Sequence, residues 1–515
     1  MPNQALKPSI VFVSFEGQFE EFGEVGKHLR AAGVGSVLWT YAKRDYRAAL
    51  KLGVFDEVVD LLEGFDRRRR STVEEHAETL RRLRNIERSV GDNSFHLDAA
   101  MDRVLTGASD AEIDLRSIRD RWTHQQVAEV SLTLWNAIEA QIQRGYVLLA
   151  IGETNSLALR IAYRCLAKHG IAHCYPAVMA HLGGGMYFED TLDFSWERCR
   201  ELYREFLARG IPSAYQSFAE GTLKAIKEQR AKPSYFVAAR RGPRGWTDRL
   251  RPRQVLQGVQ SWRVALDPVE QSSPRTVSPE VVSPIARFKR SLAVKARRKY
   301  YETVASRELP ESPYGCYFLH VQPEYSTEGL AFEHQDQVAT IRNIVASLPA
   351  DMVLVVKDHK TEGGRRSRDY YAEIISIPNV CLVHDTLDSL RIIEKSKMSF
   401  TLSGTVALES MCLGVPCVLL GNIYYEEFKG VYKAQNFTHL RELLRKAEEL
   451  LPASREQALA ALAARYAASY RARYPGSPGD EGNIKKLTEA VLHELRIRKL
   501  VPDSIAARET SMRRV

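Results

Sequence analysis

Short apolar runs alternate with stretches of helical period along most of the chain. The runs are about five or six residues long, as is usual for strands, and many are rich in Val, Ile and Leu. In the first half the predicted strands are 9–14, 36–41, 146–153 and 171–175. In the second half they are 316–321, 352–357, 380–385, 398–403 and 416–421. Strands that alternate with helices predict parallel sheets with helices packed on their faces.

The stretches between the runs predict helices and divide the chain. The predicted helices are 19–32, 158–169, 196–208, 213–229, 331–348, 370–377, 387–395 and 406–413. We therefore expect an α/β protein with two Rossmann-like domains that face a cleft, a helical insertion at about 66–143 and a helical tail. The predicted divisions are an N-terminal acceptor domain (1–231), a Pro-, Arg- and Ser-rich linker (232–286), a C-terminal donor domain (287–439) and the tail (440–515).

Length and composition agree with this division. At 515 residues the chain exceeds the size of a single core, and 44% hydrophobic with 27% charged residues is ordinary for a globular protein. The seven cysteines are scattered without a C-x-x-C pair, so neither a zinc site nor a dithiol motif is expected. The N-terminal run IVFVSF is too short for a secretory signal, and no stretch approaches the ~20 apolar residues that span a bilayer.

The net charge of +9 comes mainly from clusters at 67–70, 240–253 and 287–298. These clusters are either solvated surface or contacts for an anionic membrane or an anionic sugar. No nucleic-acid-binding motif is recognised, so nucleic acid is not an expected partner. We expect a cytoplasmic protein that rests peripherally on the inner face of the cell membrane.

The segment FTLSGTVALESMCLGVPCVLLG (400–421) carries the strongest chemical signal. A strand ends at about Leu402, and a helix begins just after Ser403, Gly404 and Thr405. A helix N-terminus exposes N–H groups that suit a phosphate, and Glu409 lies about one turn further on, where it could hold a ribose. The alternative is that the hydroxyls only cap the helix and that Glu409 lies at the surface.

Two further predicted strands end in polar residues. YFLHVQPEYST (317–327) places Gln322 and Glu324 beside a proline-fixed turn. VLVVKDHK (353–360) places Lys357 and His359 at its end, where a cation and an imidazole could grip a phosphate. Because strands of a parallel sheet end at one edge, these residues are expected to face one pocket together with Ser403.

The motifs HVQPE (320–324), His334-Gln335, VKDH (356–359) and SGTVALESMCLGVP (403–416) resemble those of the bacterial capsule polysaccharide biosynthesis family, which includes capsular Kdo transferases. The resemblance covers about 120 residues of the second domain. It implies a GT-B fold and a nucleotide-activated donor, often CMP-Kdo. It also implies donor contacts from the matching residues Gln322, Glu324, Lys357, His359, Ser403, Gly404, Thr405 and Glu409.

The sequence departs from this family pattern at several positions. Asp358 and Lys360 stand where the family has Glu and Pro, His334 stands where Asn is usual, and Ser410 where Ala is usual. These departures leave the identity of the sugar open.

The catalytic carboxylate is expected from the first domain or from Glu324. Glu16 and Glu153 each follow a predicted strand and would face the cleft as base or nucleophile. Alternatively, each is an acidic residue near a helix N-terminus. His181, with the glycines at 183–185, marks a loop that either closes on a substrate or forms a plain surface turn. No D-x-D motif follows a strand, so a metal-independent reaction without a cofactor is expected.

The predicted function is a glycosyltransferase that moves a sugar from a nucleotide-activated donor, with a CMP-sugar favoured, to a lipid-linked or polysaccharide acceptor in surface polysaccharide synthesis. One alternative is a nucleotide-sugar epimerase-like enzyme, because that fold also uses an S-G…E segment. The other is a non-catalytic sugar-binding assembly protein of the same fold.

Overall fold

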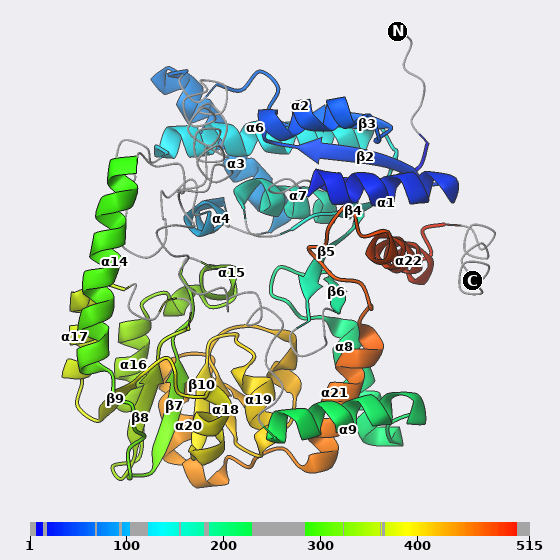
Figure 1. Cartoon of the computed structure of the whole chain (residues 1–515). Helices are drawn as coiled ribbons and strands as arrows, with labels where there is room; N and C mark the ends of the chain where they lie inside the picture. Colours follow the sequence, from blue (N-terminus) through cyan, green and yellow to red (C-terminus); the bar gives the residue numbers. More distant parts are fainter. Residues whose placement is uncertain are drawn as a thin grey trace.

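The computed structural model describes residues 7–13, 18–66, 69–91, 95–102, 122–153, 156–179, 185–228, 284–322, 324–360, 362 and 366–501. Two six-stranded sheets organise these residues into two α/β domains (Figure 1). This confirms the predicted fold class of two Rossmann-like domains. Most of the predicted linker and part of the predicted insertion lie outside the described residues.

The N-terminal sheet has the order β3-β2-β1-β4-β5-β6. Its strands are β1 (Ser9–Val13), β2 (Gly35–Thr40), β3 (Glu57–Asp60), β4 (Val147–Ile151), β5 (Ala172–Val178) and β6 (Met186–Glu189). All pair in parallel except β6, which is antiparallel to β5. The chain turns from one side of the sheet to the other between β1 and β4, which is the switch point where doubly wound sheets bind ligands.

Apolar side chains cover both faces of this sheet. One face packs beneath α6 (His124–Gln143) and α7 (Leu157–Lys168), and the other beneath α1 (Phe19–Ala31) and α22 (Glu481–Ile497). The helices α2 (Lys43–Leu52), α3 (Val73–Val90) and α4 (Phe95–Met101) complete this part of the chain. The described part of the predicted insertion, α3, α4 and α6, is therefore helical.

The C-terminal sheet has the order β12-β11-β10-β7-β8-β9, and all of its strands are parallel. The strands are β7 (Tyr314–Phe318), β8 (Val353–Lys357), β9 (Val380–Val383), β10 (Met398–Thr401), β11 (Cys417–Leu419) and β12 (Val431–Lys433). The helices around it are α14 (Pro284–Val304), α15 (Tyr325–Glu328), α16 (Gln337–Val345), α17 (Arg368–Ser376), α18 (Ser389–Lys395), α19 (Val406–Leu413) and α20 (Phe437–Arg445). Short 3-10 turns occur at Phe332–His334, Tyr424–Glu427 and Ala447–Glu449. Here the switch point lies between β7 and β10.

The predicted helix 331–348 is shorter than expected. Only α16 is α-helical there, because the Asp336 side chain accepts a hydrogen bond from the Ala339 N–H and starts the helix at Gln337.

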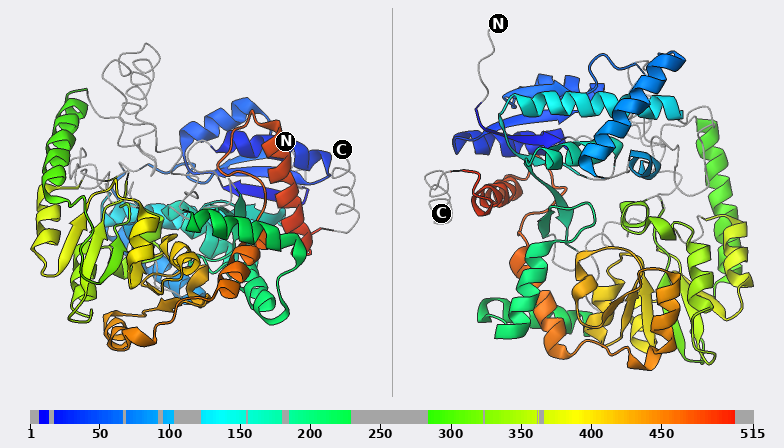
Figure 2. Two further views of the ribbon diagram at one scale, coloured as in Figure 1. Left: turned by 60° about the horizontal axis from the view of Figure 1, so that its bottom comes forward. Right: turned by 180° about the vertical axis from the view of Figure 1, so that it is seen from behind.

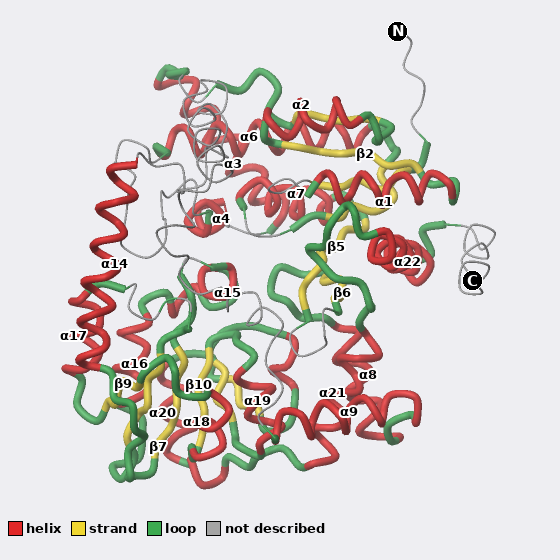
Figure 3. Tube along the Cα trace, in the orientation of Figure 1, coloured by secondary structure: helices red, strands yellow, loops and turns green. Residues whose placement is uncertain are grey.

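The chain passes from the N-terminal to the C-terminal domain between β6 and the helices that follow it, and it returns near its end. The helices α8 (Glu197–Arg209) and α9 (Ser213–Lys227) follow β6 and pack against α21 (Arg455–Ala468) beside the C-terminal sheet, as the views in Figure 2 show. Alanines of α21 are buried in this cluster, and small side chains allow three helices to approach closely. The chain then returns, and α22 packs on α1 of the N-terminal domain (Figure 3). The domain boundaries predicted from the sequence stay predictions.

Candidate functional site

Three of the predicted polar strand ends meet at one edge of the C-terminal sheet. β10, β7 and β8 are neighbours in the sheet and run in parallel, so the residues that follow them share its carboxyl edge. The three motifs that the sequence singled out are therefore adjacent in space. This edge faces the N-terminal domain.

The turn after β10 leads directly into α19. Thr405 is the residue before the helix, and its side chain makes no capping hydrogen bond, so the first N–H groups of α19 have no side-chain cap. The Gly404 N–H donates to the Thr401 hydroxyl at 3.1 Å. A Cβ atom on Gly404 would lie 2.9 Å from Thr401 Oγ1 and 3.0 Å from His320 Nε2. Only glycine fits between these groups without displacing them.

The hydroxyls of this turn tie it to its surroundings. Ser403 Oγ donates to the Ser326 carbonyl at 2.7 Å, and Thr405 Oγ1 donates to Glu409 Oε1 at 3.2 Å. Glu409 is buried one turn into α19 and does not line the cavity described below, whereas Ser403 and Thr405 do. A role for Glu409 in holding a ribose stays a prediction.

The turn after β7 is held by a network of glutamines. Gln322 donates to the Gln335 carbonyl at 2.8 Å and accepts from Gln337 at 2.6 Å. Gln337 also accepts a hydrogen bond from the His320 N–H and donates one to the His320 carbonyl. Glu324 lines the cavity, and its carboxylate accepts from the Ser326 hydroxyl at 3.1 Å. Gln322 thus shapes the turn, while Glu324 faces the open space.

The polar residues at the end of β8 are buried or partly buried and lie outside the cavity lining. Lys357 is buried, and burial lowers the pKa of its ammonium group. Burial likewise lowers the pKa of His359. The intervening Asp358 is held by Arg366 at 3.1 Å and by the Tyr371 hydroxyl at 2.6 Å, so it stabilises this turn. Neither Lys357 nor His359 lines the cavity.

His320 was not among the predicted site residues, although it belongs to the HVQPE motif. It lies at the switch point, and its Nε2 is 3.4 Å from Thr401 Oγ1. Partial burial lowers its pKa to about 3, so the ring is neutral at physiological pH. Through its contact with Thr401, His320 connects the turns after β7 and β10.

The N-terminal domain contributes Glu153 from the end of β4, at its own switch point. Its carboxylate accepts hydrogen bonds from Gln18 Nε2 at 2.6 Å and from the Tyr474 hydroxyl at 2.9 Å. Burial raises the pKa of Tyr474 well above its ordinary value, so its hydroxyl stays protonated and donates. The other predicted carboxylate, Glu16, and the loop residues His181, Gly183 and Gly184 lie outside the described residues.

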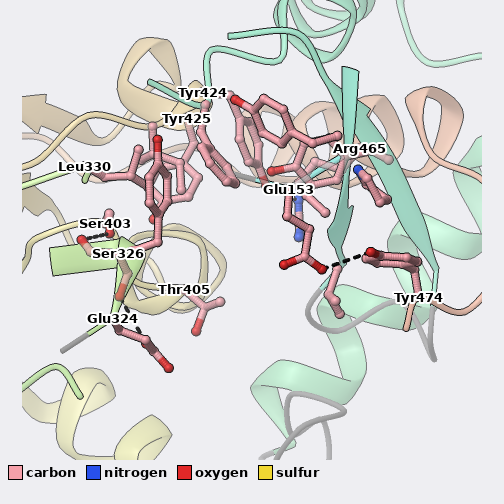
Figure 4. A pocket seen from close by; sticks show the side chains of 18 of the residues that line it. Glu153, Glu324, Ser326, Leu330, Ser403, Thr405, Tyr424, Tyr425, Arg465 and Tyr474 are labelled. Atoms are coloured by element: carbon pink, nitrogen blue, oxygen red, sulfur yellow. Dashed lines mark hydrogen bonds between the residues drawn. The ribbon is translucent and has the colours of Figure 1, made fainter. Parts of the chain in front are cut away.

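A cavity of about 390 Å³ lies between the two sheet edges. Glu153 and Tyr474 line one side, and Glu324, Ser326, Ser403 and Thr405 line the other, as Figure 4 shows. Aromatic rings form much of the remaining wall; they are Tyr175, Tyr187, Phe194, Tyr325, Tyr424 and Tyr425. Apolar walls with a few convergent polar groups are typical of a small-molecule site.

Arg465 adds a positive charge that the sequence did not single out. It comes from α21, is almost fully buried, and donates from Nε to the Tyr424 hydroxyl at 2.8 Å. The available signal was an arginine inside an alanine-rich run. Arg465 reaches the cavity lined by Ser403 because α21 packs against α8 and α9. No local sequence pattern predicts this packing.

Tyr325 joins the two domains at the rim of the cavity. Its hydroxyl donates to the Leu192 carbonyl and accepts from Arg160 Nη1 at 3.0 Å. Its ring also packs against Phe194 with centroids 5.3 Å apart. Arg160 and Arg164 are in turn paired with the buried Asp98. Because Tyr325 directly follows Glu324, these contacts fix one side of the site to the N-terminal domain.

Neither a metal-ligand cluster nor a membrane-spanning helix is present among the described residues. No group of three His, Cys, Asp or Glu side chains among them could hold a metal ion. No helix within these residues is long and apolar enough to cross a membrane.

No family model matches the chain, and a comparison with curated proteins finds no match. Among solved structures, the beta Kdo 2,4 transferase KpsC of Thermosulfurimonas dismutans is 12% identical with a TM-score of 0.34, covering 62% of this chain and 78% of that chain. The UDP-GlcNAc 2-epimerase of Methanocaldococcus jannaschii is 11% identical with a TM-score of 0.23, covering 90% and 98%. A glycosyltransferase from Rickettsia africae ESF-5 is 8% identical with a TM-score of 0.27, covering 97% and 99%. These likenesses are distant and do not assign a function to this chain.

Proposed function

We propose that this protein is a glycosyltransferase that moves a sugar from a nucleotide-activated donor to a glycan or glycolipid acceptor. The observation that carries the proposal is the cavity itself. It lies between the switch points of two Rossmann-like sheets, with the uncapped N-terminus of α19 on one side and Glu153 on the other.

In this proposal the C-terminal domain binds the donor. The N–H groups at the start of α19, with the hydroxyls of Ser403 and Thr405, bind the donor phosphate, and Gly404 lets it approach the backbone. As the sugar–phosphate bond breaks, charge develops on the leaving phosphate, and fixed N–H dipoles stabilise it. Lys357 and His359 lie at the same sheet edge, where the ammonium group of Lys357 adds positive potential and the neutral ring of His359 contributes only its dipole.

Glu153 is the proposed catalytic carboxylate. Tyr474 and Gln18 hold it by two hydrogen bonds, and its carboxylate faces the cavity from the acceptor domain. A base so oriented takes the proton of an acceptor hydroxyl as that oxygen attacks the sugar carbon. Glu324, across the cavity, is the second candidate for this role.

The specific nucleotide sugar that we propose as the donor is CMP-Kdo. The support is the resemblance of the motifs at 320–324, 356–359 and 403–416 to the capsule polysaccharide family. The positive charge of Arg465 in the cavity wall suits an acidic sugar. A lipid-linked acceptor at the inner membrane face, reached through the basic segments, completes this proposal.

The test begins with donor binding. Thermal unfolding of the purified chain is followed with CMP, UDP, GDP and their sugars, and stabilisation by CMP compounds is expected. Stabilisation by UDP or GDP compounds alone would remove the CMP-Kdo part of the proposal. Turnover of the stabilising donor is then measured with lipid-linked and polysaccharide acceptors.

The Glu153→Gln variant separates catalysis from binding. It is expected to keep donor stabilisation and to lose turnover by about 10²–10⁴-fold, the usual contribution of a general base. Full turnover in this variant would reject Glu153 as the base, and Glu324→Gln is its parallel test. Conversion of a nucleotide sugar to its epimer without acceptor would favour the epimerase alternative, and binding with no turnover of any donor would favour the assembly protein.

A further inference from the structure

A second cavity lies away from the site, where the chain crosses between the domains for the last time. Its volume is about 280 Å³. Arg198 of α8 and Arg471 of the crossing segment line it, together with Lys486 and His493 of α22. Among the described residues that line it, Glu489 is the one carboxylate. Three permanent cations and a histidine thus meet around one opposing charge.

Hydrogen bonds and stacking hold the two arginines and the histidine in place. Arg471 lies over the Tyr466 ring at 3.4 Å and donates to the Ser469 hydroxyl at 3.1 Å and the Tyr466 carbonyl at 2.7 Å. Arg198 donates to the Tyr470 hydroxyl at 3.3 Å. That hydroxyl also lies 2.8 Å from His493 Nδ1. A guanidinium that is already positioned loses little side-chain entropy when it binds an anion.

The neighbouring acidic groups have partners of their own. Glu494, which accepts from Tyr470, is paired with Arg498 at 2.9 Å. Asp480, at the start of α22, is paired with Arg473. These pairs leave the cavity with a surplus of positive charge.

The position of this cavity links it to both domains. Tyr470 pairs with Met186 of β6 through two backbone hydrogen bonds of 3.0 and 2.7 Å, so the two crossing segments run side by side. Arg198 lies on a helix that packs with α21 near the C-terminal sheet, whereas Lys486 and His493 lie on a helix that packs on α1 (Figure 3). An anion in this cavity would contact both groups of helices.

We infer that this cavity is a second anion-binding site, separate from the site between the sheets, and that it takes a phosphate-bearing group. Arginine and lysine from different elements around a polar pocket are the side chains that proteins use for phosphate. A bound phosphate bridges α8 and α22 and so stabilises one arrangement of the two domains. The phosphate comes either from a soluble compound or from a lipid headgroup.

Pyrophosphate binding to the full chain tests the inference, with the affinity measured by calorimetry at low and high salt. Lys486 is exposed, so Lys486→Glu is expected to fold normally and to weaken binding by about 10-fold or more, as reversal of a charge beside an anion implies. Glu489→Gln is expected to strengthen binding. The matched control is Lys446→Glu, an exposed lysine of the C-terminal domain, which is expected to leave the affinity unchanged.

Thr405→Val separates this cavity from the site between the sheets. Binding lost in Thr405→Val and retained in Lys486→Glu would overturn the inference, because pyrophosphate would then occupy the other cavity. Equal affinities in wild type, Lys486→Glu and Glu489→Gln, or no binding to wild type, would also overturn it.

Vesicles distinguish the two sources of phosphate. If phosphatidylglycerol vesicles bind the wild type and bind Lys486→Glu more weakly, while phosphatidylcholine vesicles bind neither, the ligand is a headgroup. If pyrophosphate shows the expected pattern and neither vesicle binds, the ligand is soluble.

Discussion

The carboxylate of Glu153 accepts a hydrogen bond from the Tyr474 hydroxyl at 2.9 Å, although the two residues lie 321 positions apart in the chain. The tail therefore completes the candidate site. Gln18 donates to the same carboxylate oxygen, and its own amide oxygen lies 2.5 Å from the Tyr474 hydroxyl, which shares its one proton between Glu153 and Gln18. The three side chains form a partly buried polar network in which the orientation of each depends on the other two.

Tyr474→Phe should lower turnover without abolishing donor binding. The variant keeps the ring and removes one hydrogen bond to a charged group, which is worth about 1.5–3 kcal/mol, so kcat should fall about 10–100-fold. The donor KM should change little, because in the proposed function the donor phosphate binds to the other domain. Steady-state kinetics checks this, with Tyr432→Phe as the control, since the Tyr432 hydroxyl bonds Leu451 at the surface. An unchanged kcat in Tyr474→Phe would show that this bond does not orient the base.

Gly404→Ala should weaken donor binding. The added methyl group would lie 2.9 Å from Thr401 Oγ1 and 3.0 Å from His320 Nε2, so the turn before α19 must shift. A misplaced helix N-terminus loses N–H contacts to the phosphate, and a loss of affinity of about 10-fold or more is expected, as for one or two charge-assisted hydrogen bonds. Calorimetric titration with the donor nucleotide measures it. Gly221→Ala is the control, because nothing lies within 4 Å of its Cβ position and a helical alanine should raise stability by about 0.5–1 kcal/mol.

His320 should make the folded state sensitive to acid. Its pKa is about 3 in the folded state against an ordinary value of 6.5, so below pH 6.5 the unfolded chain takes up a proton that the folded chain does not. The contribution of His320 to the free energy of unfolding is therefore greatest above pH 6.5. It falls by about 1.4 kcal/mol per pH unit as the pH decreases from 6.5 toward 3. Urea unfolding between pH 7 and pH 4 measures the slope. The slope should be smaller in His320→Gln, whereas His439→Gln, at a partly exposed histidine away from the cavity, should match the wild type. Equal slopes in all three proteins would contradict this.

Tyr325→Phe should loosen the contact between the domains. The variant loses the hydrogen bonds to the Leu192 carbonyl and from Arg160, and leaving both groups without this partner should lower the free energy of unfolding by about 1–3 kcal/mol. Small-angle X-ray scattering should show a larger radius of gyration for the variant without donor. In Tyr314→Phe a buried hydrogen bond within one domain is lost, so stability should fall while the dimensions stay the same. Identical dimensions for Tyr325→Phe and wild type would argue against a fixing role for this residue.

The sequence predicted the central strands and the turns that follow them. β7, β8 and β10 are short, largely buried runs in which apolar side chains predominate or alternate with small ones, and they end at the polar motifs beginning near His320, Lys357 and Ser403. Because these strands are parallel neighbours in one sheet, their ends lie together at one edge, as the sequence predicted. By contrast, β3, β6 and β12 were missed, because each has only two or three apolar residues in a row before a charged one.

The rest of the site depends on contacts between distant parts of the chain. Arg465 and Tyr474 reach the cavity because α21 packs with α8 and α9 and the chain then returns to the N-terminal domain. No periodicity or motif in the tail specifies that path. Similarly, nothing in VKDH shows that Asp358 bonds Arg366 and Tyr371 while Lys357 is buried outside the cavity lining.

The paired crossing of Met186 and Tyr470 has a consequence for how the protein can be divided. Neither half is a continuous piece of sequence, because α8 and α9 belong with α21 while α22 belongs with α1. No single cut in the gene would release either half intact, and a truncation after residue 440 would remove helices from both. Any opening of the cleft must also move these two adjacent backbone segments together, because Met186 and Tyr470 are hydrogen-bonded to each other.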